Sequence, residues 1–328
     1  MVKFTGCDEE NAAFMIDPEI YTAEEIALLS ECILCPRECG IDRFRGGEGY
    51  CGADAGMNIA SVCIHRGEEP PISGPAGICN IFFAGCNLRC SYCQNYDISR
   101  PQCAGNKTKM NLNDCLHVVE RILNQGIRAV GFVSPSHVIP QVKAIIRGLH
   151  ARGFKPLTVY NTNSYDKVET LREISGMIDV YLPDFKYVSA RLAEIYSDAP
   201  DYPDVALKAL KEMYYQKGSV LLTGESGISE SGMLIRHLVL PGHSSESIEL
   251  LRTLAGELST GVHLSLMSQY HPVSQVRNHP IINRPLYSEE YEEVVSEMEK
   301  LGFRNGWIQD MKSFNNYLPD FNREHPFE

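Results

Sequence analysis

Three closely spaced cysteines are the residues of this chain best suited to chemistry. Cys86, Cys90 and Cys93 follow the apolar run 81–84 in a C-x3-C-x2-C pattern, and the aromatic Tyr92 precedes the third cysteine. Three thiolates can hold three irons of a cubane [4Fe–4S] cluster, which leaves the fourth iron without a protein ligand. An open coordination position distinguishes a reactive metal site from a structural one. The pattern therefore predicts a reactive iron–sulfur site.

Zinc is the alternative for these cysteines, because C-x2-C pairs such as Cys32/Cys35 and Cys90/Cys93 are also typical of zinc ribbons. The two pairs are too far apart in sequence for the usual ribbon spacing, and Cys86 would be surplus. The ligand count and the position after an apolar run favour iron–sulfur ligation.

Composition limits the class of protein. A chain of 328 residues is long enough for one barrel-sized domain with an appendage. The formal net charge of -12 argues against nucleic acid as a partner, since phosphate binding requires an excess of Lys and Arg. The first ten residues lack the basic-then-apolar pattern of a signal peptide, and no apolar run is long enough to span a bilayer. We expect a cytoplasmic protein without a membrane partner.

The twelve cysteines are unevenly placed, since all of them lie between Cys7 and Cys115. A secreted disulfide protein of this length would rarely cluster its cysteines in this way. Reduced thiols that bind metal in a cytosolic enzyme fit the distribution better.

Residues 1–74 are expected to form a cysteine-rich amino-terminal extension. Thr22 and Glu25 form a capping-box signature that opens a short helix. Four cysteines follow in a C-x2-C-x3-C-x11-C pattern, which is enough to close a tetrahedral site. The pattern leaves open a structural zinc ion, an auxiliary iron–sulfur cluster or buried thiols without a metal. The four cysteines are Cys32, Cys35, Cys39 and Cys51.

Residues 75–328 alternate short apolar strands with helical patterns, which is typical of βαβ units and a parallel sheet. The expected strands are 79–84, 129–133, 157–160, 178–182, 234–240 and 262–267. The expected helices are 112–123, 138–149, 165–174, 204–216, 245–258 and 288–301. Six such repeats predict an α/β fold that falls short of the full eight-fold barrel.

Polar residues follow five consecutive predicted strands. Because catalytic groups gather at the carboxyl ends of parallel strands, we expect these residues to line one site. They are Ser134 to His137, Asn161 to Tyr165, Asp184 with Lys186, the segment from Arg236 to Gly242, and Tyr270 with His271.

The cysteine loop resembles that of the radical S-adenosylmethionine (SAM) enzymes, which carry C-x3-C-x-(aromatic)-C after the first barrel strand. The resemblance implies a partial (β/α)6 TIM-like barrel with one open side. It also implies that SAM binds the open iron of the [4Fe–4S] cluster and is cleaved reductively to methionine and a 5′-deoxyadenosyl radical. Tyr92 would then lie beside the adenine.

The strand ends resemble, in order, those of the pyruvate formate-lyase-activating enzymes over about residues 79–275. The matching motifs are Asn-Thr-Asn, Asp-x-Lys, Arg-x-x-Val-x-Pro-Gly and Tyr-His. The resemblance implies that Asp184, Lys186 and His271 hold the amine and carboxylate of SAM. The full set of implied SAM contacts is Tyr92, Ser136, His137, Asn161, Thr162, Asn163, Asp184, Lys186, Arg236 and His271.

Two positions differ from the activating-enzyme pattern. Pro135-Ser136-His137 stands where those enzymes carry Gly-Gly-Glu, and a histidine does not bind an amine as a carboxylate does. Asn161 stands where they carry an aspartate that helps to bind a monovalent cation, so such a site would lose one charge.

The extension also resembles that of a poorly characterised group of activating-enzyme-like radical SAM proteins of bacteria and archaea. The resemblance lies in the cysteine spacing, in Gly49-Tyr50-Cys51-Gly52 and in the segment 65–74. Within that segment, His65, Glu68 and Glu69 either face substrate or metal, or form a solvated turn punctuated by prolines.

These patterns predict a radical SAM enzyme that abstracts hydrogen from a protein or peptide, as activating enzymes do. Such an enzyme takes its electrons from an external donor such as flavodoxin or ferredoxin. The alternatives are radical modification of a small metabolite and an iron–sulfur sensor or electron carrier without catalysis. The sequence identifies no catalytic residue beyond the cluster and SAM contacts.

Overall fold

The computed structural model describes residues 16–46, 49–101, 110–312, 319–321, 323 and 326–327. Cys7 and Cys103, two of the clustered cysteines, lie outside these residues.

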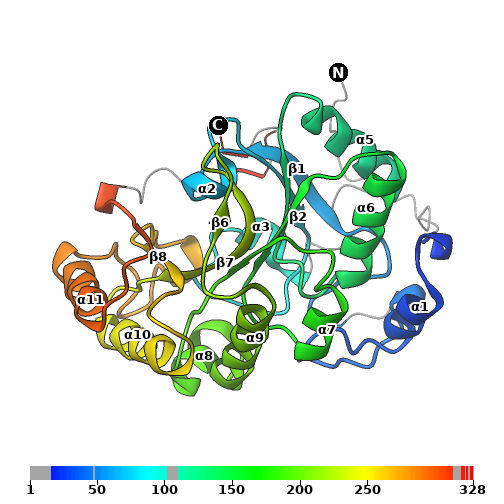
Figure 1. The fold of residues 1–328 in the computed structure, drawn as a ribbon. Coiled ribbons are helices and arrows are strands. Elements are labelled where there is room, and N and C mark those ends of the chain that lie inside the picture. Colours follow the sequence, from blue (N-terminus) through cyan, green and yellow to red (C-terminus); the bar gives the residue numbers. More distant parts are fainter. Residues whose placement is uncertain are drawn as a thin grey trace.

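A nine-stranded sheet carries the fold of the described residues (Figure 1). Its strands are β1 (Ile59–His65), β2 (Ile78–Phe83), β3 (Ala129–Val133), β4 (Leu157–Thr162), β5 (Val180–Pro183), β6 (Leu222–Thr223), β7 (Ser229–Leu238), β8 (His263–Met267) and β9 (Gly306–Ile308). Neighbours run in the order β1-β2-β3-β4-β5-β7-β8-β9, with β6 paired to β7. Pairing is parallel from β2 to β9, whereas β1 and β6 run antiparallel to their partners.

Helices connect the parallel strands and follow one another around the outside of the curved sheet (Figure 1). They are α5 (Leu112–Leu123), α6 (Ile139–Ala151), α7 (Val168–Glu173), α8 (Ala190–Ser197), α9 (Tyr202–Lys217), α10 (Ser244–Glu257) and α11 (Ser288–Leu301). The shorter α1 (Ala23–Ser30), α2 (Pro70–Ser73) and α3 (Tyr96–Ser99) precede them. All six predicted strands and all six predicted helices occur, and the open partial barrel is confirmed.

Three strands have no counterpart in the sequence-based prediction. Strand β1 belongs to the extension and adds an antiparallel edge to β2. Strands β6 and β9 are only two and three residues long, so neither produces a periodic pattern. The division of the chain at residue 74 stays a prediction, and β1 shows that the extension shares the sheet with the rest of the chain.

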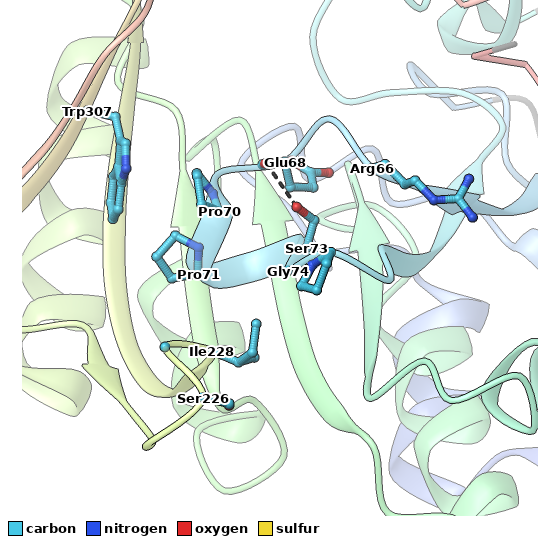
Figure 2. Close-up of a pocket in the computed structure, with 11 residues that line it drawn as sticks. Arg66, Glu68, Pro70, Pro71, Ser73, Gly74, Ser226, Ile228 and Trp307 are labelled. Atoms are coloured by element: carbon cyan, nitrogen blue, oxygen red, sulfur yellow. Dashed lines mark hydrogen bonds between the residues drawn. The ribbon is translucent and has the colours of Figure 1, made fainter.

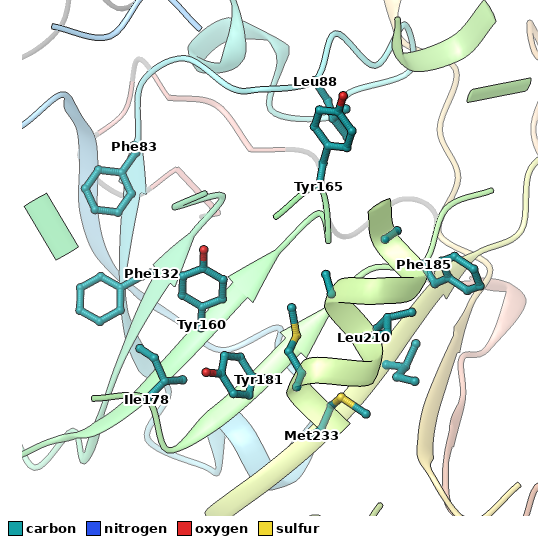
Figure 3. Close-up of a cluster of buried hydrophobic side chains, with 14 of the residues drawn as sticks. Phe83, Leu88, Phe132, Tyr160, Tyr165, Ile178, Tyr181, Phe185, Leu210 and Met233 are labelled. Atoms are coloured by element: carbon teal, nitrogen blue, oxygen red, sulfur yellow. The ribbon is translucent and has the colours of Figure 1, made fainter. Parts of the chain in front are cut away.

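The alternation of side chains along each strand divides the core into two parts. One set, including Phe132, Tyr160 and Tyr181, points outward and packs against helices such as α9, which contributes Leu210 (Figure 3). The other set points into the barrel and forms a smaller cluster with Ile72 of α2. Its members from the strands include Ile78, Ala129, Val159, Val180, Leu182 and Leu234. Helix α2 of the extension therefore fills one end of the barrel interior.

Helix α1 is held to the barrel by a buried carboxylate. Thr22 and Glu25 form the predicted capping box at the start of α1. The Glu25 carboxylate also accepts two hydrogen bonds from Arg147 of α6, at 2.7 and 2.8 Å, and lies 3.3 Å from the Nζ atom of Lys143. The Glu25 side chain thus both caps the amino terminus of α1 and binds that helix to α6.

None of the helices in the described part of the chain is both long and apolar enough to cross a bilayer.

We predict that Glu25→Ala lowers the free energy of unfolding by about 2–3 kcal/mol, because it breaks the capping box and leaves Arg147 and Lys143 without their shared partner. Denaturant titration followed by circular dichroism measures the change. Glu24→Ala on the exposed side of the same helix is the control and should change stability little. Equal effects of the two substitutions would contradict a docking role for Glu25.

Candidate functional site

A cavity of about 400 Å³ occupies the barrel interior at the carboxyl ends of the strands. The inward-facing positions of successive strands form its walls, and the three cysteines of the loop after β2 also line it. The strand residues that line it are His65, Phe82, Val133, Asn161, Arg236, Leu238, Ser265, Met267, Trp307 and Ile308. The cysteines and the polar strand ends, predicted separately from sequence, thus meet in one place.

The cysteine loop is fixed by its surroundings. Gly85 has φ +80° and its Cα faces the carbonyl oxygen of Cys51, so an added Cβ would overlap that oxygen. This is why the turn between β2 and the first cysteine requires glycine at this position. Asn87 donates to the carbonyl of Tyr165 at 2.6 Å and accepts from Asn163 at 2.8 Å.

Each of the three sulfur atoms accepts at least one hydrogen bond. Cys86 accepts from the backbone N–H of Leu88 at 3.4 Å and from the Asn163 amide at 3.5 Å. Ser197 donates to the Cys90 sulfur at 3.0 Å, and Ser99 donates to Cys93 at 3.5 Å. Donors aimed at sulfur stabilise thiolates, and hydrogen bonds to sulfur tune the potential of a cluster.

Burial, with the neighbouring Cys90, raises the pKa of Cys86 to about 12 and also raises the pKa of Cys93. Without a metal these thiols stay protonated at neutral pH, and binding iron would displace their protons. Three inward-facing cysteines with donors on every sulfur fit a [4Fe–4S] cluster. Within the described residues, no three His, Cys, Asp or Glu side chains are gathered to hold a single metal ion. A cluster differs in that each cysteine binds its own iron.

Tyr92 belongs to a buried chain of hydroxyl groups that ends on a cluster ligand. Its hydroxyl lies 2.6 Å from that of Tyr187, which in turn lies 2.9 Å from the Ser197 hydroxyl. Ser197 then donates to Cys90. Sequence reasoning missed Tyr187 and Ser197, because nothing in the spacing of α8 indicates that its last residue faces the loop after β2.

The predicted SAM contacts that line the cavity are Asn161, Asn163, Asp184, Lys186 and Arg236, together with Tyr92. Lys186 and Asp184 form an ion pair with a distance of 2.6 Å between Nζ and Oδ2. Burial alone would lower the pKa of Lys186, but the Asp184 carboxylate, with Cys90, outweighs it and raises that pKa above its ordinary value. A fixed cation and a carboxylate thus lie beside the cysteines, where they can bind a zwitterion.

Four predicted contacts do not reach the walls of this cavity, as the described residues define them. Thr162 takes the outward-facing position of β4. Its hydroxyl bonds the Ser136 hydroxyl, and both hydroxyls bond the buried Asp166 carboxylate. His137 is fully buried, and its Nε2 lies 2.9 Å from the carbonyl oxygen of Ala84. Burial lowers the pKa of His137 to about 4, so it is neutral. His271 lies two residues beyond Gln269, which lines the cavity. SAM contact by Ser136, His137, Thr162 and His271 stays a prediction.

The extension supplies charged residues to the same cavity. Glu69 forms a bidentate ion pair with Arg236, and Glu68 bonds both Arg236 and the Asn80 amide. Although burial raises the pKa of Glu68, Arg236 lowers it to about 2. His65 lines the cavity beside them and packs against Phe327 in a tilted arrangement, with 4.2 Å between ring centroids. The solvated-turn interpretation of this segment is therefore wrong, because both carboxylates are buried and paired.

A second cavity of about 440 Å³ lies at the end of the barrel that α2 fills (Figure 2). Pro71, Ser73 and Ile228 line it, and it shares Glu68, Pro70 and Trp307 with the first cavity. The segment from Glu68 to Pro70 therefore separates the two cavities.

The four cysteines of the extension lie outside both cavities. Cys32, Cys35 and Cys51 are buried and Cys39 is half-buried. The buried guanidinium of Arg43 lies among them and donates to the Cys51 sulfur at 3.5 Å.

The family model described as "Radical SAM superfamily" matches residues 80–255. This chain belongs to the radical SAM superfamily. The predicted membership is confirmed, and the superfamily consists of enzymes whose fold implies SAM and a [4Fe–4S] cluster.

Several known proteins are similar to this radical SAM protein. The uncharacterized protein MJ0674 of Methanocaldococcus jannaschii is 28% identical over 294 residues, which cover 87% of this chain and 79% of that protein. Lipoyl synthase of Mycobacterium leprae is 23% identical over 227 residues, which cover 66% of this chain and 64% of that enzyme.

Solved structures also resemble the chain. SuiB of Streptococcus suis, bound to the precursor peptide SuiA, has a TM-score of 0.49 at 14% identity. The match covers 76% of this chain and 52% of SuiB, so the chain spans about half of that protein. A domain of pyruvate-formate lyase-activating enzyme from Bacteroides vulgatus has a TM-score of 0.37 at 14% identity and covers 52% of this chain and 93% of that domain.

We predict that Ser197→Ala lowers the midpoint potential of the reconstituted cluster by tens of millivolts, because the lost O–H···S bond stabilises the more negative, reduced state. Redox titration followed by electron paramagnetic resonance measures the potential. Ser189→Ala removes a serine from the start of the same helix without touching sulfur and should leave the potential unchanged. A Ser197→Ala potential equal to that of the unsubstituted protein would contradict the assignment.

Replacing either member of the cavity ion pair should weaken SAM binding about ten- to a hundredfold, since a buried hydrogen bond to a charged group contributes about 1.5–3 kcal/mol. Equilibrium binding to Asp184→Ala and Lys186→Ala tests this, with the cluster spectrum as a check on folding. Lys211→Ala breaks a surface ion pair with Glu257 and serves as the control. Unchanged affinity in both cavity variants would remove the pair from the SAM site.

Proposed function

We propose that this protein is a radical SAM enzyme that abstracts hydrogen from a protein or peptide, in the manner of the activating enzymes. The observation that carries the proposal is the meeting of Cys86, Cys90 and Cys93 with the Asp184–Lys186 pair in one cavity. An iron–sulfur sensor or electron carrier needs no such cavity beside its cluster. A cavity lined by the three cysteines and this ion pair therefore favours an enzyme over an electron carrier.

The residues of the chain have separable roles in this proposal. Cys86, Cys90 and Cys93 would hold the cluster, with Ser197 and Asn163 donating to its ligand sulfurs. When bound, the cluster supplies the electron that cleaves SAM to methionine and a 5′-deoxyadenosyl radical. Lys186 would bind the methionyl carboxylate and Asp184 the amine, which fixes the direction in which SAM lies. An external one-electron donor such as flavodoxin or ferredoxin would reduce the cluster.

The open side of the barrel supports a polypeptide substrate. Within the described residues, β1 and β9 are the two edges of the sheet and do not pair with each other. Side chains near both edges, His65 at one and Trp307 and Ile308 at the other, line the cavity. A segment of a partner chain would enter between these edges, beside Phe327, which packs on His65 and Phe82 there. The net charge of -12 makes nucleic acid a poor substrate.

Anaerobic reconstitution followed by a SAM-cleavage assay tests the enzymatic proposal. With dithionite, the unsubstituted protein should release 5′-deoxyadenosine, and Cys86→Ala, Cys90→Ala and Cys93→Ala should each abolish release. Cys115→Ala, a buried cysteine of α5 outside the cavity, should retain it. Release of 5′-deoxyadenosine by the protein lacking all three loop cysteines would show that the assignment is wrong.

The same assay with deuterated candidates tests the substrate class. A polypeptide substrate should transfer deuterium from a labelled residue into 5′-deoxyadenosine, and a glycyl radical partner should also give a persistent doublet by electron paramagnetic resonance. Transfer from a small metabolite with no polypeptide present would overturn the polypeptide proposal while leaving radical SAM chemistry intact.

A further inference from the structure

The cysteine-rich segment of the extension folds through tight turns, and three of its four cysteines are buried. Two turns join them, with hydrogen bonds from Gly40 N–H to the Cys32 carbonyl and from Glu38 N–H to the Cys35 carbonyl, both 3.0 Å long. A further turn at Gly49 presents Cys51. These turns bring residues from both ends of the C-x2-C-x3-C-x11-C pattern together.

Burial and neighbouring thiols shift the pKa values of two of these cysteines. Burial, with the nearby Cys51 and Cys32, raises the pKa of Cys35 to about 12. Burial also raises the pKa of Cys51, to which Cys32 and Cys39 contribute. Burial, which removes these thiols from water, is the first cause of both shifts.

A buried positive charge lies in this region. Arg43 is 1% exposed, donates from Nη1 to the His137 carbonyl at 2.7 Å and from Nη2 to the Cys51 sulfur, and its Nε has no partner. Within the described part of the chain, Arg43 forms no ion pair with a carboxylate. A buried guanidinium without an anion costs several kcal/mol. Four neutral thiols do not offset that cost, whereas thiolates bound to metal do.

We propose that Cys32, Cys35, Cys39 and Cys51 bind a second iron–sulfur cluster and that Arg43 is its buried counter-ion. Four cysteines complete the ligand set of a [4Fe–4S] cluster, so this centre would have no open iron and would not bind SAM. A cluster with four thiolate ligands carries a net negative charge, and the Arg43 guanidinium lies beside one of the ligand sulfurs, where it can balance part of that charge.

The lack of a single-ion site among the described residues favours a cluster over zinc. A zinc site requires its ligands to converge on one point at about 2.3 Å each. No three His, Cys, Asp or Glu side chains of the described residues are gathered in that way. In a cluster each cysteine binds a different iron, so the sulfur atoms lie further apart.

The proposed centre lies directly behind the reactive loop. The Cys51 carbonyl abuts Gly85, and Arg37 donates to the Asn87 carbonyl at 3.0 Å. Arg43 also reaches the loop indirectly, through His137, whose ring bonds the carbonyl of Ala84. The segment that holds the second centre therefore contacts the loop of the first on both sides of Cys86.

The test begins with a protein in which Cys86, Cys90 and Cys93 are all replaced by alanine, so that the reactive site cannot bind iron. After anaerobic reconstitution it should keep about four irons and four sulfides per chain, and the unsubstituted protein about twice that. Adding Cys35→Ala and Cys51→Ala should remove the residual iron, whereas adding Cys115→Ala should not. Circular dichroism checks that each variant is folded.

A folded triple variant that holds no iron, or that holds zinc instead of iron, would overturn the proposal. If the five-fold variant fails to fold, Arg43→Met and Arg43→Lys in the triple background decide the matter. Loss of the charge in Arg43→Met should lower the potential of the residual cluster relative to Arg43→Lys, and equal potentials would exclude the counter-ion role.

The inference does not depend on the proposed function, and the two fail separately. Residual iron in the triple variant, with no SAM cleavage by the unsubstituted protein, would remove only the enzymatic proposal. SAM cleavage without residual iron would remove only the second cluster.

Discussion

The positive φ angle at Gly85 is the constraint on which the rest of the site depends. Strand β2 is buried on both faces and cannot continue, so the chain must turn where only a residue without a side chain fits against Cys51. Beyond the turn, the backbone of the loop pairs with the end of α8 through Arg89 and Ser91. Barrel, extension and α8 therefore fix one loop together, and that loop carries the three cysteines on which the chemistry rests.

The two-residue period of the strands then decides which polar side chains share the cavity with that loop. Asn161 points inward from β4 and Thr162 outward, so adjacent residues of one motif lie on opposite sides of the sheet. The inward residue faces the cavity, and the outward one bonds Asp166 beneath it. A motif matched residue by residue to a family therefore contains both residues that line the cavity and residues that support them.

The extension is part of the site as well as its support. Strand β1 joins the sheet, α2 fills the barrel end, and the segment between them places Glu68 and Glu69 on Arg236. An arginine expected to meet SAM is thus already bound by two carboxylates. Their combined charge is negative, because two carboxylates face one guanidinium. The part of this cavity around Arg236 consequently owes its negative charge to residues that precede the barrel in the chain.

The sequence by itself determined the reactive loop, the six β/α repeats and the capping box of α1, because each is written in local spacing: C-x3-C-x2-C, alternating apolar runs, and Thr22 with Glu25. Only the tertiary structure decided which polar residues face the cavity, that His137 is buried and neutral, and that Ser197 bonds Cys90. These depend on contacts between residues far apart in the chain, such as Cys90 and Ser197, which are separated by 107 positions. Spacing within one segment carries no information about such pairs, since burial and hydrogen-bond partners are set by how the elements pack.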